Sequence, residues 1–368
     1  MLGDLDVLAR GGLSLDDFLA EATSSVQRAV PWVGACVGTH DPATMMLTSA
    51  RKYGALVAHN DHDQLFGIIE YGSDEATSFR SLAVSEHRAI GMHETTSGEV
   101  ERSERMTRLM QPIYGFADEA RLLLRDGARV WGSLAMFRGT DDQSITADEV
   151  EFLGTLSESF ARGVRSGMLA RLAAGHATDP DATGPAVVIV DAHDRISQIS
   201  TGAEERLDQL RGDAHGGDPL SLVMSLVGAA RRTLGTPGAG LPRARVRTGS
   251  GMWLLLHASP LRGADGTVGD VVVTIEEARP PEIVALVVAA FGLTPRERDV
   301  TRLVLQGVDT KEIASTLHVS AYTVQDHLKS VFDKAGVRSR RELISRVYFD
   351  QYVPRMGGDT GPTGWFTG

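Results

Sequence analysis

The chain has 368 residues, of which 42% are hydrophobic and 23% charged, so it is not a largely disordered protein, and its length predicts two or three domains. Its single cysteine, Cys36, excludes an internal disulfide and a cysteine-built zinc site, and fits a reducing cytoplasm. The net charge is −11, and no apolar run approaches the roughly 18 residues of a membrane span. We therefore expect a cytoplasmic protein without a membrane contact, and no signal peptide because residues 1–13 lack a basic region.

Residues 1–173 are expected to form a first domain in which helices alternate with strands. The segment 15–30 carries apolar residues at helical spacing, and the run 32–38 is typical of a buried strand. The segments 121–125 and 130–137 indicate a pair of strands joined by a short turn.

A long helix is expected to close this first domain. Thr146 and Glu149 have the spacing of a capping box, which opens a helix. The apolar stripe that follows continues to Leu172, farther than a helix needs to cover a small sheet. The stripe either packs on its own domain or forms the contact of a dimer. Residues 174–185 are typical of a linker.

Residues 184–278 predict a second, smaller unit of antiparallel strands with helices on one side, which gives an α+β fold class. The expected strands are 186–191, 195–199, 253–258 and 271–275. A helix is expected over 201–210, and the Gly- and Pro-rich stretch 235–251 is expected to be a surface loop. The proline pair in 278–282 is expected to stop a strand or a helix.

Charge is unevenly distributed along the chain. Residues 291–349 hold ten Lys and Arg against seven Asp and Glu, a net charge of +3, whereas the remainder holds 27 against 41, a net charge of −14. A basic segment on an acidic body suggests a nucleic-acid-binding module.

This basic segment predicts four short helices. Thr294 and Glu297 form a capping box around a proline in the first turn, and Gly307 can end that helix in a left-handed conformation. We expect the next three helices to be capped at their N-termini by Asp309, Ser320 and Ser339. The second and third helices, joined by a tight turn, have the form of a helix-turn-helix.

The third helix would enter the major groove of DNA, with Gln325, Asp326 and Lys329 on its outward face. Glutamine can bind adenine through two hydrogen bonds, aspartate can accept from cytosine, and lysine suits phosphate or guanine. Helical periodicity alone favours the alternative, a plain helical bundle with a solvated polar face.

Residue identities favour DNA binding, because this segment resembles the LuxR/NarL/FixJ helix-turn-helix family over about 60 residues. The residues that carry the resemblance are Leu293 to Glu297, Gly307, Lys311 to Ala314, Leu317, Val319, Ser320, Thr323, Val324, His327, Leu328, Lys334 to Val337 and Arg340. The positions at which this family contacts phosphates are Lys311, Ser320, Thr323 and Lys329, and those at which it reads bases are Gln325 and Asp326.

The chain departs from this family at Gln325, where lysine is usual, so one positive contact is missing and the DNA sequence it reads is expected to differ. Glu297 is expected to be structural, as a helix cap and as the partner of an arginine such as Arg340.

The body of the chain is similar to known sensor domains. Residues 1–173 resemble a GAF domain through the segment 130–137 and the helix from Thr146, and residues 184–278 resemble a PAS domain through 186–207 and the late strands. The remaining parts are a DNA-binding domain at 282–352 and a flexible tail at 353–368. This order is familiar among bacterial one-component transcription regulators.

A small-molecule pocket is expected in the first domain, between its sheet and the segment 53–112, which is rich in aromatic residues and methionine. The predicted ligand-binding residues are Tyr53, Tyr71, Met92 and Trp131, with Trp131 in the floor of the pocket. The alternative is that these side chains simply fill an irregular core.

The sequence predicts a regulator that binds duplex DNA as a homodimer, with Val347 and Tyr348 as a second candidate contact besides the long helix. Two roles of the body remain open: sensing a small-molecule effector, or serving as a ligand-free platform for protein interaction and dimerisation. No catalytic site, cofactor or metal site is expected, and His59 to Asp63 are expected to form a solvated loop. Contact with RNA polymerase is left open.

Overall fold

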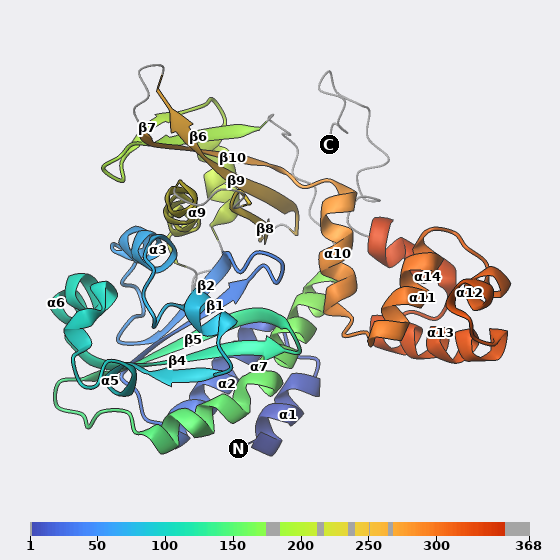
Figure 1. Cartoon of the computed structure of the whole chain (residues 1–368), viewed down its shortest axis with the longest axis horizontal. Coiled ribbons are helices and arrows are strands. Elements are labelled where there is room, and N and C mark those ends of the chain that lie inside the picture. Colours follow the sequence, from blue (N-terminus) through green and yellow to red (C-terminus); the bar gives the residue numbers. More distant parts are fainter. Residues whose placement is uncertain are drawn as a thin grey trace. The chain divides into compact units, whose positions relative to one another are not determined.

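A computed structural model describes residues 2–173, 185–211, 217–234, 240–249, 251–263 and 268–349 (Figure 1). They belong to two compact units, one made of residues 1–170 with 183–277 and the other of 171–182 with 278–368. Nearly all of the expected linker and the whole expected tail lie outside the described residues. Within the described ranges, no helix combines the length and the apolar character that a membrane span requires.

The first unit contains a five-stranded antiparallel sheet with the order β2-β1-β5-β4-β3. Its strands are β1 (Gly34–His40), β2 (Leu47–Gly54), β3 (Ala89–Gly91), β4 (Phe116–Asp126) and β5 (Arg129–Gly139). The expected hairpin of β4 and β5 is present, and Gly127 takes a left-handed φ of 58° in its turn.

Helices lie on both faces of this sheet (Figure 1). One face carries α1 (Leu2–Arg10), α2 (Leu15–Ala29) and α7 (Ala147–Ala173), and the helix nearest the opposite face is α3 (Asp63–Gly72). The short elements after α3 are α4 (Phe79–Val84), α5 (Met92–Thr95), η1 (Val100–Arg102), η2 (Met106–Met110) and α6 (Gln111–Tyr114).

The long helix α7 begins with the expected capping box. The Thr146 N–H donates to Glu149 Oε2 at 2.8 Å, and the Glu149 N–H donates to Thr146 Oγ1 at 3.3 Å. The apolar stripe packs inside the chain, because Leu156 and Phe160 are fully buried and the Phe160 ring meets that of Phe18 edge to face at 5.9 Å. The part of the stripe from Val150 to Val164 is therefore covered by the chain itself.

The second sheet of the first unit repeats the strand order of the first, as β7-β6-β10-β9-β8. Its strands are β6 (Ala186–Val190), β7 (Ile196–Ile199), β8 (Arg243–Arg247), β9 (Trp253–Arg262) and β10 (Val268–Glu277), and its helices are α8 (Ala203–Leu210) and α9 (Leu220–Thr233). The prediction of a surface loop over 235–251 is wrong for residues 243–247, which form the edge strand β8. In this strand Ala244 and Val246 are buried and alternate with arginines, as in a strand with one covered face.

The two sheets are joined through side chains far apart in sequence. The helices α3 and α9 pack against each other (Figure 1), and strand β2 approaches β8. The buried Arg245 guanidinium donates to both carboxylate oxygens of Asp41, at 2.7 Å and 2.5 Å. Both sheets thus belong to one compact unit, although the sequence suggests separate domains.

The second unit is helical. Its elements are α10 (Pro280–Ala290), α11 (Pro295–Leu305), α12 (Thr310–Leu317), α13 (Ala321–Ala335), α14 (Arg340–Ile344) and η3 (Ser345–Phe349). Strand β10 ends at Glu277, just before the proline pair, as expected. The pair also opens α10, since proline fits the first turn of a helix where its missing N–H has no partner to lose. The helix α10 packs on η3.

Candidate DNA-binding surface and ligand cavity

The helices α12 and α13 form the expected helix-turn-helix. His318 ends α12 with a left-handed φ of 55°, which turns the chain sharply before α13 begins. Ile313 on α12 and Val324 on α13 are fully buried, and Ala314 is small enough for the two helices to approach closely. The packing of these apolar faces fixes the direction of α13 and leaves its polar face in solvent.

The first turn of α13 is held by its cap. Ser320 Oγ accepts from the Thr323 N–H at 3.0 Å, and the two hydroxyl oxygens lie 2.9 Å apart. Backbone N–H groups at the start of a helix have no partner inside the helix, and the helix dipole favours an anion there. Both hydroxyls therefore lie where a DNA phosphate can be bound.

Most of the residues predicted to bind DNA are exposed in the structure, and the spacing of Gln325, Asp326 and Lys329 places these three on one face of α13. Gln325, Asp326 and Lys329 are all exposed on α13, and Lys311 is exposed in the first turn of α12. Sequence analysis missed Tyr322, whose side chain is 76% exposed next to them. The signal that could have identified it is a large aromatic residue placed between Ser320 and Thr323, in the polar first turn of α13.

Glu297 lies in α11 and ties this helix to α13. Its Oε2 accepts from the Thr294 N–H at 2.7 Å, its Oε1 accepts from Ser330 Oγ at 2.6 Å, and Lys334 Nζ contacts both oxygens, at 2.8 Å and 2.6 Å. The prediction that Arg340 pairs with Glu297 is wrong, because Arg340 donates to the backbone carbonyls of Val304 and Val308.

The environment of Glu297 favours its charged form. Burial alone would raise the pKa of this carboxyl group, but the hydrogen bonds from Lys334, Ser330 and the Thr294 N–H outweigh it and lower the pKa to about 2. Glu297 is therefore a structural group that positions α13.

We expect Glu297→Gln to destabilise the packing of α11 on α13 by about 1–3 kcal/mol at neutral pH, because charged hydrogen bonds are lost. A lowered pKa stabilises the fold above the unfolded pKa, near 4.5, and this contribution disappears as the pH falls toward about 2. Hydrogen exchange of 294–305 and 321–335 in the full chain should show faster exchange in the variant at pH 7, with the difference smaller at pH 3. The exposed Glu312→Gln is the control, and equal exchange in both variants at pH 7 contradicts the assignment.

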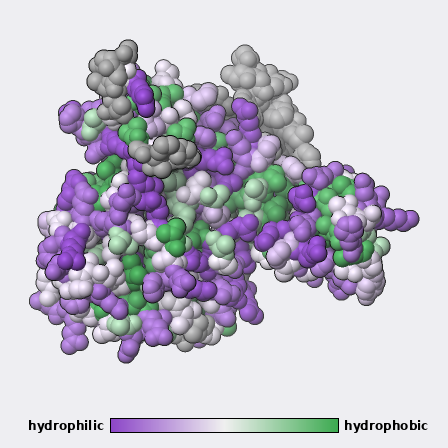
Figure 2. Space-filling view, viewed as in Figure 1, coloured by the Kyte–Doolittle hydropathy of each residue, from purple (hydrophilic) through white to green (hydrophobic). Residues whose placement is uncertain are grey.

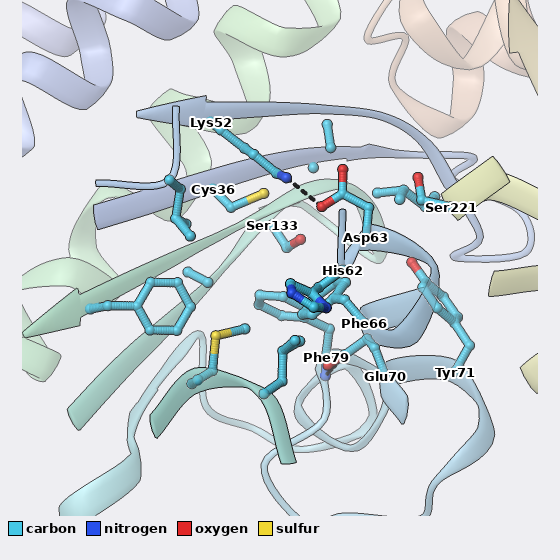
Figure 3. A pocket seen from close by; sticks show the side chains of 18 of the residues that line it. Cys36, Lys52, His62, Asp63, Phe66, Glu70, Tyr71, Phe79, Ser133 and Ser221 are labelled. Atoms are coloured by element: carbon cyan, nitrogen blue, oxygen red, sulfur yellow. Dashed lines mark hydrogen bonds and ion pairs between the residues drawn. The ribbon is translucent and has the colours of Figure 1, made fainter. Parts of the chain in front are cut away.

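The first unit contains a cavity of about 60 Å³ between its sheet and α3 (Figure 3). Its lining includes apolar residues from the sheet, α3, α4 and η2, among them Phe66, Phe79 and Phe137. Ser221 of α9 also lines it, so the second sheet's helix completes the wall. A space of this size holds several water-sized groups, and thus a small ligand.

Of the predicted ligand-binding residues, only Tyr71 lines this cavity. Tyr53 bonds Thr23 of α2, and Met92 is buried in the same apolar cluster as the cavity wall without reaching the cavity. The register of β4 and β5 shifts at Trp131, so that Val130 joins the cluster on the cavity side and the fully buried Trp131 stays outside the lining.

The loop expected to be solvated is exposed at His59 and Asp61, but its His62 and Asp63 line the cavity. Asp63 is buried and pairs with Lys52, whose Nζ also donates to the His59 carbonyl at 2.5 Å and to Asn60 Oδ1 at 3.0 Å. Asp63 also accepts from the Asp218 N–H at 3.0 Å, which links the loop to the start of α9. In the described part of the chain, no three His, Cys, Asp or Glu side chains are placed to hold a metal ion.

Cys36 lines the same cavity from β1. Burial raises the pKa of its thiol to about 12, so the thiol is protonated at neutral pH and a poor nucleophile.

Comparison with known proteins identifies the helical unit. The family model described as bacterial regulatory proteins, luxR family, matches residues 292–347. The spore germination protein GerE of Bacillus subtilis is 44% identical over 52 residues, which cover 14% of this chain and 70% of GerE. An HTH-type transcriptional regulator of Mycobacterium bovis is 54% identical over 53 residues, which cover 14% of this chain but only 6% of that relative.

Solved structures add distant similarities. The VqmA dimer of Vibrio cholerae, a LuxR-type receptor, is 17% identical with a TM-score of 0.22, over 45% of this chain and 82% of that one. SdiA of Escherichia coli is 11% identical with a TM-score of 0.29, over 91% and 90% of the two chains. Scores this low carry no argument about the first unit. Through residues 292–347 and the match to most of GerE, the chain belongs to the luxR family of bacterial regulatory proteins.

Proposed function

We propose that the chain is a transcription regulator that binds specific duplex DNA through the exposed face of α13. The observation that carries this proposal is the clustering of Gln325, Asp326 and Lys329 on the second helix of a helix-turn-helix that lies inside the luxR-family match. Lys311, Ser320 and Thr323 would bind phosphates, which fixes the position of α13 in the groove, while Gln325 and Asp326 would read base edges.

Binding as a dimer is the second part of the proposal, since one helix-turn-helix buries little surface on DNA. The α7 stripe is buried within the chain from Val150 to Val164, and Val347 is buried as well. We assign the contact to the side of α10 formed by Val284, Ala285 and Val288, of which Ala285 is exposed and the two valines are half-buried. The other large apolar side chains of α10 are buried within the chain. Hydrophobic side chains gather over this helix on the face drawn in Figure 2. An apolar helix of this kind needs a partner on each side.

Control by a small molecule is the third part. The first unit, proposed to be GAF-like over 1–173 and PAS-like over 184–278, would hold the effector in the cavity beside α3. The packing of α3 on α9, and the bond from the Asp218 N–H to Asp63, give an effector a route to the second sheet. An effector that changes DNA affinity must have its own affinity changed by DNA to the same factor.

DNA-binding measurements on the full chain test the assignment of α13. Lys329→Ala should weaken binding to every duplex and reduce the slope of log affinity against log salt by about one unit, because one phosphate contact is lost. Gln325→Ala should instead remove about 1–3 kcal/mol of discrimination at one base position. Arg102→Ala, which removes an exposed charge from the first unit, is the control. Equal losses on cognate and scrambled duplexes in both α13 variants contradict the base-reading role.

The cognate duplex for that experiment comes from selection with the full chain on a random pool. A dimer predicts an inverted repeat whose half-sites are about one helical turn, roughly 10 base pairs, or a multiple of it apart. Enrichment of a single unrepeated half-site would contradict binding as a dimer.

A further inference from the structure

The cavity beside α3 presents no unpaired formal charge from its lysine or its carboxylates. Lys52 is neutralised by Asp63 and bonded to two further oxygens (Figure 3). Glu70 accepts from the Phe79 N–H at 2.8 Å with one oxygen and from Arg121 at 2.7 Å with the other. A charged ligand would leave water without gaining an ionic partner, which is costly in an apolar site.

One pair of uncharged polar side chains does line the cavity. His40 is 4% exposed, and its Nε2 lies 3.1 Å from Ser133 Oγ. Its Nδ1 has no hydrogen-bond partner among the described residues. Leaving a buried nitrogen unpaired is costly, and a partner supplied by a ligand would recover that cost.

Burial keeps His40 uncharged, because it lowers the pKa of the imidazole to about 4. A neutral imidazole donates from one nitrogen and accepts at the other, and the Ser133 hydroxyl can take either role toward Nε2. Nδ1 is therefore free either to accept or to donate, and a hydroxyl group on a ligand can pair with it in both cases.

Most of the remaining lining is apolar, although Cys36, His62, Tyr71 and Ser221 also contribute to it. Phe66, Phe79 and Phe137 contribute ring surface, with Leu47, Leu56 and Leu109 between them. A volume of about 60 Å³ is well above the roughly 10–15 Å³ that a cavity needs to hold one water, so a compact molecule can be accommodated.

We propose that this cavity binds a compact, uncharged and largely apolar molecule with one hydroxyl or carbonyl group that bonds His40 Nδ1. The inference rests on the ligand control in the proposed function and gives it a chemical class. Ser221 of α9 completes the wall of the cavity, so such a molecule would contact both halves of the first unit.

The test compares four probes that share one ring: cyclopentanol, cyclopentane, cyclopentylammonium and cyclopentanecarboxylate, each titrated by ligand-observed NMR against the full chain at pH 7.5. Cyclopentanol should bind about three- to tenfold tighter than cyclopentane, which is the gain in affinity expected from one neutral hydrogen bond. It should bind at least about tenfold tighter than either ion, because each ion would lose its hydration without gaining an ionic partner. Binding of either ion within threefold of cyclopentanol, or no binding of cyclopentanol at millimolar concentration, overturns the proposal.

Variants place the probe in this cavity. Ala135→Leu adds three carbon atoms to the lining and should abolish binding of both cyclopentanol and cyclopentane, while Val84→Ala, on an exposed residue, should change neither. His40→Phe should remove the preference for cyclopentanol and keep cyclopentane binding. Unchanged cyclopentanol binding in folded Ala135→Leu overturns the site. If cyclopentanol binds as predicted but leaves DNA affinity unchanged at saturation, the cavity assignment is supported and the ligand control in the proposed function is contradicted.

Discussion

Replacing Arg105 by methionine is expected to lower the free energy of unfolding of the first unit by about 3–5 kcal/mol, the cost of breaking a buried ion pair from one side. The Arg105 side chain is 1% exposed and reaches three carboxylates, Glu119 at 2.7 Å, Glu70 at 3.3 Å and Glu75 at 3.4 Å. Without the guanidinium Glu119 and Glu75 lose their main counter-charge, while Glu70 keeps only its pair with Arg121.

Only part of this loss can be recovered by Arg121. Its guanidinium pairs with Glu70 at 2.7 Å, lies 3.6 Å from the centre of the Phe79 ring, and approaches Glu119 at 3.4 Å. It is already bonded to the Thr77 carbonyl at 2.5 Å, so it is not free to move toward Glu75. A single arginine is then left among three carboxylates.

The measurement is urea unfolding of the full chain, followed by hydrogen exchange of β4 to assign the loss to this unit. Arg102→Met is the matched control, because Arg102 forms an exposed pair with Glu99 whose loss should change stability by less than about 1 kcal/mol. The double variant Arg105→Met/Glu119→Leu should regain part of the loss, since the carboxylate nearest to Arg105 is then removed as well. Equal stability of Arg105→Met and Arg102→Met would contradict a structural role for this network.

Short-range signals made several elements predictable from sequence. The capping boxes of Thr146 and Thr294 both form, and Gly127 and Gly307 take the left-handed conformations that a turn and a helix end need. These features depend on residues within four positions of one another, so their chemistry is visible without knowledge of the fold. The helix-turn-helix follows for the same reason.

Long-range packing was not predictable in the same way. The bond from Asp41 to Arg245 joins residues 204 positions apart, and nothing near either residue indicates the other. The placement of Trp131 depends on a one-residue shift between β4 and β5, which reverses the face to which its side chain points. This shift explains why a residue expected in the cavity floor lies outside the lining, while His40 and Ser133 were overlooked.

A close backbone approach between α3 and α9 gives the second large effect. A side-chain Cβ at Gly228 of α9 would lie 2.9 Å from the Ile68 carbonyl oxygen and 3.0 Å from the Gly72 nitrogen, both backbone atoms of α3. A flexible side chain could move aside, but helix backbone cannot without shifting the whole element. We expect Gly228→Leu to cost about 3 kcal/mol or more, at the upper end of overpacking effects.

The sign of this effect distinguishes packing from helix propensity. Replacing a glycine inside a helix normally stabilises it by up to about 1 kcal/mol, so Gly154→Ala in α7, whose added Cβ meets only ordinary contacts near 3.9 Å, should raise stability slightly. Gly228→Leu should do the opposite, and hydrogen exchange should accelerate in both α3 and α9 while α13 is unaffected. Because Ser221 of α9 lines the cavity, the same variant should also weaken cyclopentanol binding. A folded Gly228→Leu chain with normal stability and normal exchange in α3 would show that the two helices do not pack as closely as described.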